Sequence, residues 1–206
     1  MIDPLVLLAF LPAALALNFT PGADMLFCLA QGTRGGARPA IAASLGVSTG
    51  SMVHVLIAGL GLGYLVAQYP VIFDVIRYFG AVYLVWLAWR TLRSPLGSSD
   101  IQAMPTSRAF RDALLVNLAN PKVILFILAF LPQFVDPTRP VLPQFLILGA
   151  MIAAGGFFIN GAVGVFAGSI GQHMVKNPSF ERILRWITAT IFGALALRLL
   201  FEDKRI

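Results

Sequence analysis

Long apolar stretches separated by short polar turns make up most of this chain. A helix that crosses a bilayer needs about 20 mostly apolar residues. Six stretches meet this requirement, and they predict membrane helices at residues 5–31, 40–66, 71–89, 113–134, 142–170 and 183–201. A segment rich in Ser, Pro and Gly, residues 94–107, follows the third stretch and predicts a solvated connection.

Six helices divided by one connection indicate two halves of three helices each. We predict a first repeat at residues 1–93, a linker at 94–109 and a second repeat at 110–206. An odd number of spans per half places the second half upside down relative to the first. The predicted fold is an all-α integral membrane protein with six transmembrane helices in an inverted 3+3 repeat, in which helices 1 and 4 are interrupted.

The first helix of each half contains a similar polar interruption. Proline removes a backbone hydrogen bond from a helix, and glycine loosens the turn beside it. At membrane depth such a break is tolerated only where it faces protein or water. Matching breaks in two halves point to a substrate site at the breaks. The residues concerned are Asn18, Pro21, Gly22 and Asp24 in the first half, and Asn117, Asn120, Pro121 and Lys122 in the second.

A weaker match joins the second helices of the two halves. In each, a polar residue follows a glycine at the fourth position and so shares its helix face. His54 follows Gly50, and Asn160 follows Gly156, which places both polar residues near the site. His54 has two open roles: a proton carrier, since histidine titrates near physiological pH, or a neutral hydrogen-bonding residue between helices.

The composition agrees with a membrane protein. The 206 residues are 58% hydrophobic and 12% charged, whereas soluble domains carry roughly 25% charged residues. The mean hydropathy is +0.84. The N-terminus lacks the basic region of a cleavable signal peptide. A single cysteine excludes an internal disulfide, and two distant histidines argue against a metal site, so we predict no metal and no cofactor.

The net charge of +6 comes from basic residues between the apolar stretches, which is typical of membrane flanks and not of nucleic-acid binding. Cytoplasmic loops carry an excess of Lys and Arg. We therefore predict a cytoplasmic loop 94–107, with both termini outside. The predicted inner side holds nine basic residues, Arg34, Arg38, Arg90, Arg93, Arg108, Arg111, Lys176, Arg182 and Arg185, and the outer side holds five, Arg77, Arg139, Arg198, Lys204 and Arg205.

Asp24 and Lys122 are charged residues inside predicted spans. A carboxylate at mid-membrane costs roughly 3 kcal/mol, so Asp24 is expected to face a cavity or a partner. Lys122 has two open roles: pairing with Asp24 across the two halves, or contact with a substrate carboxylate. The ends of broken helices attract opposite charges, a carboxylate at the N-terminal end and an ammonium at the C-terminal end. An amino acid carries both groups.

Several motifs, in their order and spacing, make nearly the whole chain similar to a known family. They are NFTPGADMLF at 18–27, the Arg34-Gly35-Gly36 turn, ASLGVSTGSMVH at 43–54, GAVYLVWLAWRTLRS at 80–94 and NLANPKVILFILAFLPQF at 117–134. The sequence resembles the lysine exporter (LysE) superfamily, above all its homoserine/threonine exporter (RhtB) branch. One departure is Ala23, which stands where the family commonly has a second proline.

The resemblance implies a secondary transporter of the bacterial inner membrane that exports amino acids or close derivatives, coupled to proton entry. The ten residues named at the breaks and at the polar positions would line or adjoin its site between helices 1 and 4. The expected partners are an amino acid such as homoserine, threonine or lysine, protons, lipid, and a second copy of the chain in a homo-oligomer. Two alternatives stay open, an ion channel and a small membrane enzyme.

Overall fold

The computed structural model describes residues 2–68, 78–79, 81–82, 85–86, 88–89, 92–93, 104–168 and 178–201. These residues form helices joined by short turns, and none of them belongs to a β-strand. The elements are α1 Pro4–Phe19, α2 Ala23–Gly35, α3 Ala37–Gln68, α5 Thr106–Leu118, α6 Pro121–Ala129, η1 Leu131–Phe134, α7 Val141–Val165, η2 Phe166–Gly168 and α9 Pro178–Phe201. The predicted all-α class is confirmed for this part of the chain.

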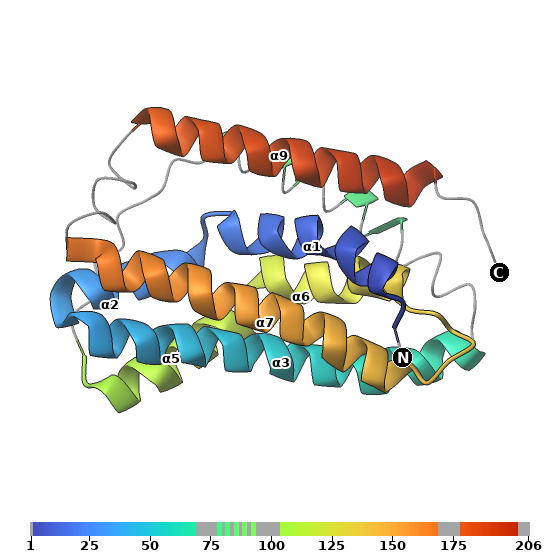
Figure 1. Cartoon of the computed structure of the whole chain (residues 1–206), viewed down its shortest axis with the longest axis horizontal. Helices are drawn as coiled ribbons and strands as arrows, with labels where there is room; N and C mark the ends of the chain where they lie inside the picture. The colour runs from blue at the N-terminus through green and yellow to red at the C-terminus, as the bar shows by residue number, and fades with distance from the viewer. Residues whose placement is uncertain are drawn as a thin grey trace.

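The helices follow one common axis, and the two broken helices run in opposite directions (Figure 1). In that view α1 leads leftward into α2, whereas α5 leads rightward into α6. The unbroken helices show the same relation, since α3 runs rightward and α7 leftward. α3 packs mainly against α7 and α5, and α1 packs against α7 and α9. The broken helix and the helix after it therefore have antiparallel counterparts in the two halves.

Two helices are long and apolar enough to cross a membrane alone, Ala37–Gly61 within α3 and Val141–Val165. Two more spans result if each broken pair crosses as one unit. The bend is 55° between α1 and α2, and 54° between α5 and the segment Pro121–Phe134. The described residues thus give two to four candidate spans. The predicted total of six stays a prediction, because most of the predicted third helix lies outside the described residues.

One predicted boundary is wrong because it rested on apolar pattern alone. α5 begins at Thr106, seven residues before the predicted start at 113. Its first turns are amphipathic: Ala109 and Ala113 are fully buried, whereas Arg108 and Arg111 are exposed. Helix therefore extends into the predicted linker 94–109, whose residues 94–103 lie outside the described part of the chain.

A second boundary is also wrong. α7 ends at Val165, where the sequence predicts a helix as far as 170, and Phe166–Gly168 tighten into a 3₁₀ turn. Short 3₁₀ turns are frequent at helix ends, where the last carbonyl groups lack α-helical partners. The apolar pattern continues through this turn, which explains why the sequence did not reveal it.

Large apolar side chains cover the outside of the bundle. Leu5, Phe79 and Phe158 are 71%, 72% and 70% exposed, and a soluble protein rarely exposes such side chains in extended patches. Trp89 is also exposed, and the guanidinium of Arg93 lies 4.7 Å from the centroid of its ring. Aromatic and basic side chains gather where a membrane meets water. This surface fits a lipid environment.

Phenylalanines join α1 to the second half of the chain. Phe10 on α1 packs against Phe130 and Phe134, with ring centroids 6.5 and 5.1 Å apart. Phe126 continues the cluster, 5.0 Å from Phe130. Such aromatic pairs add roughly 1 kcal/mol each beyond the burial of their area. The cluster therefore holds α1 against α6 and η1.

Glycines allow the helices to cross closely. A Cβ atom at Gly32 on α2 would lie 1.8 Å from the carbonyl oxygen of Gly164 on α7. A Cβ atom at Gly46 on α3 would lie 2.2 Å from the carbonyl oxygen of Phe110 on α5. Membrane helices often cross at small residues of this kind, because a larger side chain would keep the two backbones apart.

The turn from α2 to α3 requires glycine for a different reason. Gly36 has a φ angle of +80°, in the region where a side chain is strained, and its N–H donates to the carbonyl of Gly32 at 3.1 Å. Helices commonly end on a glycine in this conformation. The predicted turn at Arg34-Gly35-Gly36 is confined to Gly36, since Arg34 and Gly35 belong to α2.

We predict that Gly32→Ala destabilises the protein by on the order of 2 kcal/mol, because the new methyl group meets backbone that yields only if α2 and α7 separate. The matched control is Gly61→Ala on α3, where a Cβ atom has no neighbour within 4 Å. The control should be neutral or slightly stabilising. Thermal unfolding in detergent measures both variants, and equal unfolding temperatures would contradict the close crossing.

Candidate functional site

The first break separates α1 from α2. The last backbone bond of α1 runs from the N–H of Thr20 to the carbonyl of Ala16, at 2.9 Å. Pro21 follows and has no N–H, and Gly22 is the N-cap of α2. The carbonyl groups at the end of α1 therefore lack helical partners and need other donors.

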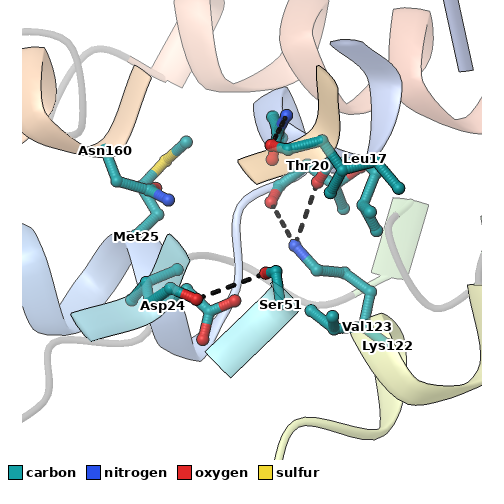
Figure 2. Close-up of a pocket in the computed structure, with 11 residues that line it drawn as sticks. Leu17, Thr20, Asp24, Met25, Ser51, Lys122, Val123 and Asn160 are labelled. Atoms are coloured by element: carbon teal, nitrogen blue, oxygen red, sulfur yellow. Dashed lines mark hydrogen bonds between the residues drawn. The ribbon is translucent and has the colours of Figure 1, made fainter. Parts of the chain in front are cut away.

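Lys122 of the second half supplies these donors. Its Nζ donates to the carbonyl oxygens of Leu17 and Thr20, at 3.1 and 3.0 Å (Figure 2). The dipole of α1 also favours a cation at this end. A Cβ atom at Gly22 would lie 3.3 Å from this Nζ. The φ angle of Gly22 is −168°, an extended conformation open to any residue, so room for Lys122 explains the glycine better than a loosened turn.

The second break separates α5 from α6. Asn120 is the N-cap of α6, and its Oδ1 accepts from the N–H of Lys122 at 3.1 Å. Pro121 takes the first helical position, where no N–H is needed. At the end of α5, the carbonyl oxygen of Asn117 lies 3.3 Å from Nε2 of His54 on α3. This contact agrees with a hydrogen-bonding role for His54 and does not test the proton-carrier role.

Asp24 connects the two breaks. It stands in the first turn of α2, is only 5% exposed, and its Oδ2 accepts from Nδ2 of Asn117 and Nδ2 of Asn120, both at 3.0 Å. Asn120 thus caps α6 with its oxygen and binds Asp24 with its nitrogen. Oδ1 of Asp24 has no hydrogen-bond partner within the described residues. An acid of the first half is therefore clamped by two amides of the second.

Of the two roles left open for Lys122, a direct ion pair with Asp24 is not what the structure shows, although the two charges interact through space. No ion pair joins these two side chains, both of which the structure describes. The lysine reaches the carbonyl groups at the end of α1 instead, because those groups are unpaired at membrane depth. Asp24 already has its two amide donors. The alternative role of Lys122, contact with a substrate carboxylate, stays a prediction.

An asparagine from each break rests on a glycine of the opposite half. Nδ2 of Asn18 donates to the carbonyl of Ile152 on α7 at 3.0 Å, and a Cβ atom at Gly155 would lie 2.6 Å from this nitrogen. Asn117 lies in the same way on α3, where a Cβ atom at Gly50 would be 2.6 Å from Oδ1. The first break therefore packs on α7 of the second half, and the second break packs on α3 of the first half.

A small cavity lies between the breaks (Figure 2). Its volume is about 10 Å³, room for roughly one water molecule. Polar side chains reach it from five helices: Asn18 of α1, Asp24 of α2, Ser51 of α3, Lys122 of α6 and Asn160 of α7. Oδ1 of Asn160 is buried and has no partner among the described residues. The space is polar but too small for an amino acid as it stands.

The structure places all ten predicted residues at or beside the breaks. Asn18, Asp24, Lys122 and Asn160 line the cavity; Asn117 and Asn120 bind Asp24; Pro21, Gly22 and Pro121 form the breaks; and His54 contacts the end of α5. Their part in transport stays a prediction.

Sequence reasoning missed Thr20 and Ser51, whose hydroxyl groups line the cavity. A signal was present for both. Thr20 lies inside the first interruption, between Asn18 and Pro21, and Ser51 directly follows the Gly50 of the weaker match. Neither residue carries an ionisable group or a side-chain amide, the two features that mark the other polar site residues in the sequence.

A larger hollow, of about 480 Å³, opens where α1 begins. Its polar lining includes Asp3, Gln133, Asp136, Arg139 and Gln144. Nε of Arg139 lies 3.1 Å from Oδ2 of Asp136, and the amide and hydroxyl of Thr138 also donate to Asp136. These hydrogen bonds hold the pKa of the Asp136 carboxyl below its ordinary value.

The sequence matches the family described as LysE type translocator over residues 15–203, a range that contains both breaks and the whole cavity. The chain belongs to this family. The resemblance drawn from the motifs is thus confirmed, and this LysE translocator is a transporter and not an enzyme. It is an integral protein of the bacterial inner membrane.

Relatives of the LysE translocator are similar over nearly their full length. A homoserine/homoserine lactone efflux protein of Salmonella typhimurium is 36% identical over 194 residues, which cover 91% of this chain and 93% of that protein. A leucine efflux protein of Enterobacter sp. is 28% identical over 196 residues, 92% of each chain. An uncharacterized membrane protein of Vibrio cholerae is 33% identical over 191 residues, 91% of this chain and 92% of that one. No solved structure matches the chain.

We predict that Asn120→Ala costs more stability than the loss of an ordinary helix cap. Loss of a cap costs about 1 kcal/mol, and loss of a donor to a buried carboxylate adds about 2 kcal/mol. The control is Asp3→Ala, which removes the cap of α1, where Oδ1 accepts from the N–H of Leu5 at 2.8 Å. Thermal unfolding in detergent compares the two, and equal losses would contradict the clamp on Asp24.

Proposed function

We propose that this LysE translocator exports an amino acid or a close derivative, such as homoserine, threonine or lysine, in exchange for protons. Asp24 carries the proposal: it is a buried acid of the first half, clamped by Asn117 and Asn120 of the second, with one oxygen free beside the cavity. An ionisable residue inside the membrane is a functional site by default. Broken helices of paired repeats are where transporters bind substrate.

The proposed architecture is an inverted 3+3 repeat with six spans. Three observations support it: the opposite directions of the broken pairs (Figure 1), their similar bends of 55° and 54°, and the reciprocal contacts of Asn18 with Gly155 and of Asn117 with Gly50. In transporters built this way, one repeat rocks against the other around a fixed site. Asp24 and its clamp lie where such movement would act.

The small size of the cavity supports an occluded stage of this cycle. A volume of about 10 Å³ is far below the roughly 300 Å³ or more of sites that hold small molecules. Substrate entry therefore requires the halves to separate. The hollow of about 480 Å³ beside Asp136 lies at the end of the bundle that the distribution of basic residues assigns to the outside, and it is the proposed exit vestibule.

Proton coupling would act through the hydrogen bonds that Asp24 accepts from Asn117 and Asn120. Within the described part of the chain, the ionisable groups that interact with Asp24 electrostatically are Lys122 on α6, His54 on α3 and Cys28 on α2. Hydrogen bonds to a charged acceptor are roughly twice as strong as bonds to a neutral one. A proton on Asp24 therefore weakens its bonds to both clamping amides. Protonation in this way loosens one contact between the two halves.

The names of the relatives narrow the substrate class. One exports homoserine and its lactone, and another exports leucine. These compounds differ in side chain, and a lactone has no free carboxylate, but all of them carry an amino group. We propose that the substrate of this chain belongs to the same class, with the amino group as its shared feature.

We predict that Asp24→Asn abolishes proton-driven transport by the protein reconstituted in vesicles, while the variant still inserts and folds. An uncoupler that collapses the proton gradient should stop the parent protein to the same extent. The matched control is Asp112→Asn, since Asp112 forms only surface ion pairs with Arg108 and Arg111 and such pairs contribute little. Transport that survives both treatments would contradict the coupling.

The same vesicles separate a carrier from the ion channel considered above. A carrier shows saturable counterflow, in which unlabelled amino acid on one side drives labelled amino acid from the other. An open pore shows none. Transport without counterflow would therefore favour a channel and contradict alternating access.

Orientation is a separate prediction. We expect Thr138→Cys to react with a membrane-impermeant thiol reagent from outside intact cells, and Ser107→Cys to react only after the cells are opened. Both positions are exposed, and Cys28 is fully buried and is replaced by Ser in the background. The opposite pattern of labelling would invert the assignment drawn from basic residues.

A further inference from the structure

Two acceptor oxygens at the cavity are satisfied by no group of the described residues. Oδ1 of Asp24 and Oδ1 of Asn160 have no donor within the described residues, although the two side chains are only 5% and 4% exposed. Both line the cavity, Asp24 from α2 and Asn160 from α7 (Figure 2). A buried acceptor without a donor is costly, so this pair of oxygens needs an explanation.

The clamp explains why one Asp24 oxygen is free. Asn117 and Asn120 both donate to Oδ2 and none of their amide groups donates to Oδ1. The carboxylate is thus held in place through one oxygen while the other is left for a different donor. Lys122 is near but gives two of its three N–H groups to the carbonyls of Leu17 and Thr20.

The two hydroxyl groups at the cavity are also committed as donors elsewhere. Thr20 donates to the carbonyl of Ala16, and Ser51 donates to the carbonyl of Val47, each one helical turn earlier. Toward the cavity they can offer only lone pairs. The amide nitrogen of Asn18 is likewise used, on the carbonyl of Ile152. The donors that these bonds leave unused are the third N–H of Lys122 and Nδ2 of Asn160. The lining thus offers more acceptors than donors, and Asp24 supplies its negative charge.

A protonated amino group complements such a lining. It is positively charged and offers three N–H donors at one compact atom, about the size of the water molecule for which the cavity has room. We propose that this cavity is an ammonium site, in which the amino group of the substrate donates to Oδ1 of Asp24 and Oδ1 of Asn160. The inference rests on the proposed function and assigns one part of its substrate to named atoms.

This assignment makes the proton and the substrate compete for one carboxylate. When the ammonium group binds, Asp24 carries its negative charge and any proton it held leaves for water. When Asp24 is protonated, the charge that binds the ammonium is gone. The described ionisable groups that interact with Asp24 are Lys122 on α6, His54 on α3 and Cys28 on α2. Asp24 is therefore the one carboxylate in this set for which a proton and an ammonium group can compete. Exchange of one proton for one amino group follows.

Paired probes that differ in a single group test the site. Homoserine lactone and α-hydroxy-γ-butyrolactone differ only in an ammonium against a hydroxyl, as do leucine and 2-hydroxy-4-methylpentanoate. Binding to the purified full-length protein in detergent is measured by the shift in unfolding temperature across a concentration series. We expect at least one amino compound to bind at least tenfold more tightly than its hydroxy partner. In weakly buffered solution, at a pH acidic enough for free Asp24 to carry a proton, its binding should also release protons, and Asp24→Asn should abolish this release.

Asn160 gives the sharpest variant. Because Oδ1 of Asn160 has no partner among the described residues, Asn160→Leu should leave the unfolding temperature without ligand unchanged or higher. It should weaken binding of the amino compound at least tenfold. Asn160→Asp keeps the acceptor and should retain binding. Phe158→Leu, on the exposed face of the same helix, is the matched control and should change neither affinity nor proton release.

Equal binding of amino and hydroxy partners would overturn the ammonium site, and so would unchanged affinity in Asn160→Leu. A rise in unfolding temperature caused by sodium chloride but not by choline chloride, and lost in Asp24→Asn, would also overturn it, because a metal cation would then fill the site. These outcomes are compatible with amino-acid export. Absence of transport by the parent protein in vesicles would instead overturn the proposed function itself.

Discussion

The structure depends on one constraint: backbone groups that a proline releases at membrane depth must find partners inside the protein. Each break meets this need with help from the opposite half. Lys122 donates to the carbonyl groups at the end of α1, and the amides of Asn117 and Asn120 bind Asp24 at the start of α2. The carbonyl at the end of α5 has His54 of the first half beside it. The two breaks therefore stabilise one another, and the halves are joined mainly by hydrogen bonds at this level.

Contacts of this kind suit a protein whose halves move. The helix crossings away from the breaks are tight and apolar, with backbones so close at Gly32 and Gly46 that no side chain fits. Packed contacts of that type are rigid. Hydrogen bonds across the breaks can instead be exchanged for bonds to water, a proton or a ligand, at a net change of only about 1 kcal/mol per bond. Both crossings join the first half to the second, α2 to α7 and α3 to α5. On the proposed function the halves would therefore pivot about these crossings while the hydrogen bonds at the polar level are exchanged.

The breaks could be located from the sequence because proline and asparagine act on the backbone of their own segment. This effect does not depend on the tertiary fold. The sequence also revealed the α-helical class and the Gly36 turn. It did not reveal the direction in which the charged side chains point. Spacing places Asp24 and Lys122 at similar depth and left two roles open for the lysine. Which way its side chain points depends on the unpaired α1 carbonyls, which the sequence does not show. The early start of α5 was missed because its exposed arginines interrupt the apolar pattern. The commitment of the Thr20 and Ser51 protons to their own helices is visible only in three dimensions.

The placement of Lys122 also explains how a buried acid keeps a free oxygen. A lysine bonded directly to Asp24 would saturate the carboxylate and leave little for another ligand, and removal of either partner would strand a charge at a cost of roughly 3–5 kcal/mol. Here the ammonium of Lys122 is bound by neutral carbonyl groups, so its charge still acts on Asp24 through space while Oδ1 has no donor. The charge of the acid is thereby balanced without its binding capacity being used. Because the carbonyl groups belong to the first break and the lysine to the second, this balance exists only when the two halves are together as they are in this structure.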